Sequence, residues 1–170
     1  MNRRMRAMRP AFYGLMTALS MVLAYAETLL PSIGIPGAKI GLPNIVTVLG
    51  LYTVGFKGTA AVSILRIVLV GLSFGNPSMM IYSLSGWVLS MAAMTAAKRT
   101  GLFTPLGVSV AGGVAHNLGQ LICACVVLES TAILAYFPFL LPAGVAAGAV
   151  VGVAGGVLTE RIKKYTDPRE

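Results

Sequence analysis

Four polar side chains lie inside long apolar stretches of the sequence, and their types are suited to ligand binding. Arg66 interrupts one such stretch, and His116, Asn117 and Gln120 interrupt another. A charged side chain within a bilayer has to be satisfied by a partner, by water or by a ligand. His116 and Gln120 are one helical turn apart and share a face. Counting about 1.5 Å of rise per residue places Arg66 and His116 within roughly 6 Å of each other in depth. We therefore predict a polar binding site near mid-membrane.

Two interpretations of Arg66 remain open at the level of the sequence. No carboxylate is expected at its depth, because Glu27 should lie much closer to the outer surface. Arg66 then either faces a polar cavity reached from outside, or bonds helix carbonyls and Asn117 and locks the bundle.

Further candidate residues lie nearer the expected outer side. Lys39 and Asn44 belong to a Gly- and Pro-rich loop, and Tyr82 lies in the following apolar region, where it is either an interfacial aromatic or part of a cavity wall. If the loop folds over the cavity, these residues form its mouth, and Arg66 with Lys39 then favours an anionic ligand. The predicted substrate-binding set is Arg66, His116, Asn117, Gln120, Asn44, Lys39, Tyr82 and Glu27.

The acidic residues do not support catalysis by this chain alone. Of the five, Glu160, Asp167 and Glu170 lie near the C-terminus and Glu129 lies at an expected helix end. With a single aspartate, no aspartate-rich diphosphate–magnesium motif is possible, and no Walker A loop, HExxH or CxxC motif is present. We expect a binding or transport subunit with no metal, no cofactor and no enzymatic activity of its own.

The composition predicts an all-α integral membrane protein made of one domain over residues 1–170. Of the 170 residues, 56% are hydrophobic and 11% are charged, whereas soluble domains carry about 25% charged residues. The mean hydropathy is +0.84. The net charge of +8 does not indicate nucleic-acid binding, because the basic residues cluster at the ends of apolar segments.

Six membrane spans are predicted, with both termini in the cytoplasm and the protein in the cell (inner) membrane. This orientation puts every basic residue except Lys39 and Arg66 on the inner side, as the positive-inside rule requires. The second span is short and crosses only if part of the preceding loop enters the membrane. The predicted spans cover about 11–30, 45–56, 58–74, 78–97, 105–128 and 132–158.

Small residues repeat every four positions on two of these spans. This spacing makes a flat stripe on which another helix can lie closely, either within the protein or on a membrane partner. A weaker version occurs on the first span. The residues are Gly144, Gly148, Gly152 and Gly156; Ala111, Ala115, Gly119 and Cys123; and Gly14, Ala18 and Ala26.

Several longer strings resemble the Gx transporter family, which is also catalogued as heptaprenyl diphosphate synthase component I. The resemblance covers about 18–156, most of the chain. The strings that carry it are ALSMVLAYAETLLP, KIGLPNIVTVLGLYTVGFKGTAAVSILRIVLVGLSFGNP, YSLSGWVLSMAAM and GVSVAGGVAHNLGQ.

That family is in turn similar to the substrate-binding S components of energy-coupling-factor (ECF) transporters. The resemblance implies a six-helix bundle that captures a small nutrient near the outer face and works with a transmembrane coupling subunit and two ATPases. Small residues on the first helix would dock the coupling subunit, at positions held here by Gly14, Ala18 and Ala26. The synthase description implies instead a non-catalytic membrane component of prenyl diphosphate or quinone biosynthesis. A subunit for flavin-linked electron transfer is a third possibility.

Overall fold

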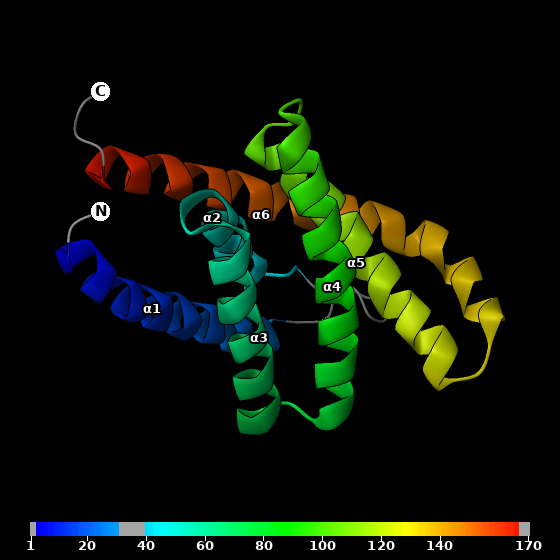
Figure 1. Ribbon diagram of the computed structural model, residues 1–170. Helices are drawn as coiled ribbons and strands as arrows, with labels where there is room; N and C mark the ends of the chain where they lie inside the picture. Colours follow the sequence, from blue (N-terminus) through cyan, green and yellow to red (C-terminus); the bar gives the residue numbers. More distant parts are fainter. Residues whose placement is uncertain (1–2, 31–39, 167–170) are drawn as a thin grey trace.

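The computed structural model describes residues 3–30 and 40–166, and every regular element in them is helical (Figure 1). The all-α prediction is therefore confirmed for the described part of the chain. The elements are α1 (Arg3–Thr28), α2 (Asn44–Thr53), α3 (Gly55–Ser73), α4 (Pro77–Thr100), α5 (Pro105–Val127), a 3₁₀ helix η1 (Thr131–Tyr136) and α6 (Phe137–Thr166).

Local sequence signals set the starts of α4 and α5. The Asn76 side chain accepts a hydrogen bond of 2.8 Å from the backbone N–H of Met79, and a proline opens the helix behind it. Thr104 caps α5 in the same way and is also followed by a proline. A polar cap followed by proline is a common start of a helix, because the cap satisfies an N–H that the helix leaves free.

Within the described ranges, four helical segments are long and apolar enough to cross a membrane: α3, α4, α5 and 131–162, which joins η1 to α6. The chain is thus a membrane protein. The second predicted span is only the ten-residue α2, about 15 Å long, which is half of the hydrocarbon thickness. The six-span count and the cytoplasmic termini stay predictions. In Figure 1 the N-terminal end of α1 and the C-terminal end of α6 lie on the same side of the molecule.

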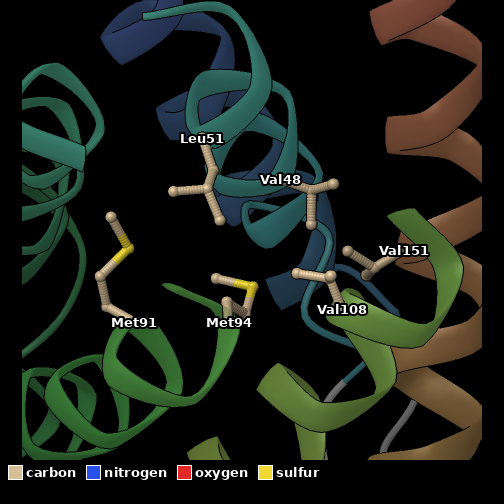
Figure 2. Packing of buried hydrophobic residues seen from close by; sticks show 6 residues of the cluster. All are labelled: Val48, Leu51, Met91, Met94, Val108 and Val151. Carbon is tan, nitrogen blue, oxygen red and sulfur yellow. The ribbon is translucent and has the colours of Figure 1, made fainter. Parts of the chain in front are cut away.

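The short helix α2 lies in the middle of the bundle. Residues 46–51 of α2 are all buried. Its Val48 and Leu51 pack in one cluster with side chains of α4, α5 and α6, including Met94, Val108 and Val151 (Figure 2). At its C-terminal end, the ammonium group of Lys98 donates a hydrogen bond to the carbonyl of Leu51. Both ends of α2 are therefore set by its neighbours.

The glycine repeat of α6 packs against the backbone of α5. A Cβ added at Gly148 would lie 2.7 Å from the Cα of Val110, and one at Gly152 would lie 2.9 Å from the Cα of Leu106. Gly144 makes a similar approach to α5. Backbones this close gain van der Waals contact that larger side chains would prevent. The α6 stripe is thus an internal packing surface.

The small residues of α1 are placed differently. Gly14 and Ala18 are exposed, and a Cβ at Gly14 would meet nothing within 4 Å. Leu15 and Val22, 65% and 63% exposed, lie on the same face. No described residue therefore packs against this face of α1.

We predict that Gly148→Val destabilises the protein by about 1–3 kcal/mol, because the α5 backbone cannot move aside without separating the two helices. Thermal unfolding in detergent measures the effect. Gly14→Val is the matched control, and we expect little change there because the position is exposed. Equal losses in both variants would contradict the assignment of the α6 stripe to internal packing.

Candidate functional site

The N-terminus of α2 lies deep inside the bundle, at the level of Arg66. The α2–α3 hairpin places Thr47 Oγ1 3.4 Å from Ser63 Oγ, and one turn further Gly50 packs against Thr59. The two helices pair in antiparallel fashion. Extending this pairing by three residues toward the start of α2 brings Asn44, its first residue, opposite Arg66.

A contact with α1 supports this depth. The Ser20 hydroxyl of α1 lies 3.5 Å from the carbonyl oxygen of Pro43, which directly precedes α2. Ser20 is eight residues from the C-terminal end of α1, so the start of α2 lies about 12 Å along the helix from that end. The backbone N–H groups at the start of α2 are already bonded, because those of residues 44–46 donate to the carbonyl oxygens of residues 41–43.

Arg66 is buried, with 9% of its surface exposed, and its Nε has no hydrogen-bond partner. It borders a small pocket between α3 and α4, with room for about one water molecule. The pocket is otherwise lined by apolar side chains and by Ser83 of α4. Among the described residues, no acceptor binds the guanidinium, so its donors remain available.

Glu27 of α1 contributes to the electrostatic environment of Arg66, but the two form no contact ion pair in the described part of the chain. Glu27 Oε1 accepts the backbone N–H of Gly41, which lies shortly before α2. Because α1 runs obliquely to α3 (Figure 1), counting residues along the helices does not give the relative depth of Glu27 and Arg66, and that depth stays a prediction.

His116 and Gln120 face α4 at Gly86. A Cβ at Gly86 would lie 2.9 Å from His116 Cε1 and 2.9 Å from Gln120 Cγ. The α3–α4 hairpin, in which Gly71 packs against Met80, puts Arg66 opposite Ser85, next to Gly86. The contacts thus agree with the predicted common depth of Arg66 and His116. Neither His116 nor Gln120 lines the Arg66 pocket, however.

Asn117 points in another direction. Its amide Nδ2 donates a hydrogen bond of 3.0 Å to the carbonyl of Leu140 on α6. This contact does not agree with the interpretation in which Arg66 is locked by a bond to Asn117. Asn117 instead joins α5 to α6, on a different face from His116.

The remaining predicted residues lie at different distances from the Arg66 pocket or outside the described ranges. Asn44 is half-buried at the level of Arg66, with its amide close to Gly41. Tyr82 is half-buried on α4, next to the pocket residue Ser83 but outside the lining. Lys39 lies outside the described residues.

Sequence reasoning missed the hydroxyl groups that accompany Arg66. Thr59 and Ser63 are buried on the α3 face that meets α2, and Arg66 continues this row. Their spacing of four and then three residues is that of a single helix face, which makes the polar row visible in the sequence. Ser83, from α4, has no comparable signal.

Arg66 is the group at this site that can recognise an anion. In the described ranges, no group of three His, Cys, Asp or Glu side chains gathers in a way that could hold a metal ion. The Nε of Arg66 has no hydrogen-bond partner among the described residues. Guanidinium groups recognise anions such as carboxylate and phosphate.

Comparison with known proteins gives one match. The family model described as "Heptaprenyl diphosphate synthase component I" matches residues 16–158. No curated protein and no solved structure matches the chain.

We predict that Arg66→Met leaves the melting temperature unchanged or raises it, because a buried charge without hydrogen-bond partners opposes folding. Asn117→Leu is the comparison, since it removes the donor to Leu140 and should cost about 1 kcal/mol or more. Thermal unfolding in the same detergent measures the melting temperature of both variants. A loss for Arg66→Met as large as that for Asn117→Leu would show that Arg66 holds the bundle together.

Proposed function

The chain belongs to the heptaprenyl diphosphate synthase component I family, and from this premise we propose that it is a membrane-embedded binding subunit for a small anionic nutrient or cofactor precursor. The observation that carries the proposal is the buried Arg66, whose Nε has no hydrogen-bond partner among the described residues. The pocket beside it has room for about one water molecule, so a ligand has to displace some of the α3 and α4 side chains that line it. The ligand is taken up in concert with a transmembrane coupling subunit and ATPases.

Electrostatics supports an anionic group at this position. The cost of a buried charge falls when an opposite charge and hydrogen bonds replace its lost hydration.

The need for partners follows from the sequence and the surface. The sequence has no ATP-binding motif, so energy for uptake comes from other subunits. The exposed face of α1 around Gly14 and Ala18 is the surface that we assign to the coupling subunit. Small residues there let a partner helix approach closely.

A second candidate function is favoured by the family description itself. In this alternative, the chain is a non-catalytic membrane component that serves prenyl diphosphate or quinone biosynthesis. It predicts an isoprenoid enzyme among the proteins that copurify from membranes. The transport proposal predicts a coupling subunit and ATPases instead.

Native mass spectrometry of gently purified protein tests the binding proposal. We expect a copurified small molecule with an acidic group, and we expect Arg66→Gln to reduce its occupancy at least about tenfold, the loss expected when one charge-assisted hydrogen bond is removed. Arg99→Gln is the matched control, because Arg99 is exposed at the end of α4 and should retain the molecule. Equal occupancy in the Arg66 variant, with the fold intact, would contradict the proposal.

A further inference from the structure

The pocket between α3 and α4 sets a buried positive charge beside a space of atomic size. It has room for about one water molecule. Arg66 is the only charged residue among the described residues that line it, and the Arg66 Nε is buried without a hydrogen-bond partner in the described ranges. The other lining residues are Ile67, Val70 and Gly71 of α3 and Met79, Met80 and Ser83 of α4.

Ser83 brings a second hydrogen-bond donor to the same pocket. Its hydroxyl makes no hydrogen bond within the described part of the chain, whereas that of Ser85 donates to the carbonyl oxygen of Tyr82 at 3.0 Å. Arg66 and Ser83 come from facing helices and line one space, so a single occupant lies next to both. Both side chains can donate hydrogen bonds, which an anion accepts.

The lining suits an anion better than a water molecule. A water molecule needs acceptors for its own hydrogens, but the lining is mostly apolar, and the carbonyl oxygen of Val70 already accepts the N–H groups of Phe74 and Gly75. Glu27 contributes to the electrostatic environment of Arg66 but is not one of the lining residues. A neutral water leaves the guanidinium without a contact counter-charge, whereas an anion offsets part of the cost of its burial.

The size of the pocket selects among anions. A carboxylate or phosphate group has three or more heavy atoms, which exceeds the space for one water molecule. Chloride is a single atom only slightly larger than water, and it gives up its hydration more readily than fluoride does.

We propose that this pocket binds a monatomic anion of the halide class, chloride, with the Arg66 guanidinium and the Ser83 hydroxyl as its donors. The ion is the counter-ion of Arg66 while the lining side chains keep the positions seen here. The proposed function does not enter this inference, because its larger ligand has to displace those side chains first.

Titration of the full chain with chloride in detergent tests the site. Sodium gluconate is replaced stepwise by sodium chloride at constant ionic strength, and the melting temperature is measured at each step. A ligand that binds only the folded state raises the melting temperature once its concentration exceeds its dissociation constant, so the onset of the rise reports the affinity. Sodium sulfate, too large for the pocket, reports the general effect of salt.

In the unmodified protein we expect chloride to raise the melting temperature, and we expect Arg66→Gln to abolish this rise. Ser83→Ala should move its onset to an at least about tenfold higher chloride concentration, the loss expected when one hydrogen bond to a charged group is removed. Ser85→Ala is the matched control and should respond like the unmodified protein, because the Ser85 hydroxyl is bonded outside the pocket. The stability of Arg66→Met described above is compared in gluconate, without a halide.

An equal chloride effect in the unmodified protein, Ser83→Ala and Arg66→Gln would be a general salt effect, with water alone in the pocket, and would overturn the inference. The absence of any chloride effect would overturn it as well. A loss in Arg66→Gln without a change in Ser83→Ala would overturn the role of Ser83. If Arg66→Gln does not fold, the comparison of the two serine variants decides.

The result is independent of the test of the proposed function. A copurified acidic molecule in a protein without a chloride response would support the proposed function and contradict the halide site. A chloride response that depends on Ser83, in a protein from which no molecule copurifies, would support the halide site alone.

Discussion

Burial of a guanidinium in a membrane protein constrains everything around it. Arg66 cannot lose its hydration without compensation, and its Nε has no hydrogen-bond partner among the described residues. The proposed anionic ligand would supply that compensation.

The short helix α2 is positioned by its neighbours. A full-length span would begin at the membrane surface, whereas α2 has only ten residues, begins beside Ser20 of α1 and ends near Lys98 of α4. Its apolar side chains pack against α4, α5 and α6. The close glycine contacts hold α5 and α6 against each other, and α2 packs against both. The position of α2 therefore depends on this packing.

Much of the helical framework is encoded locally and is visible in the sequence. The lengths of the apolar segments, together with the prolines that follow Asn76 and Thr104, predict the starts of α4 and α5 within one residue. The common level of Arg66 and His116 stays a prediction. Such features depend on residue order alone, because rise per residue is nearly constant in a helix.

The relations between helices are less accessible to sequence reasoning. That Asn117 faces α6 while His116 faces α4 depends on how α5 is rotated between its neighbours. That Glu27 accepts the N–H of Gly41 depends on the tilt of α1 and on the chain that leads into α2. Rotation and tilt are set by packing over many residues, so counting along one helix does not yield them.

An experimental density map of gently purified protein, by electron cryomicroscopy with a fiducial binder, tests the central claim most directly. The account predicts non-protein density within hydrogen-bonding distance of the Arg66 guanidinium. A guanidinium bonded instead to helix carbonyls or to another side chain, with no further density beside it, would contradict the account.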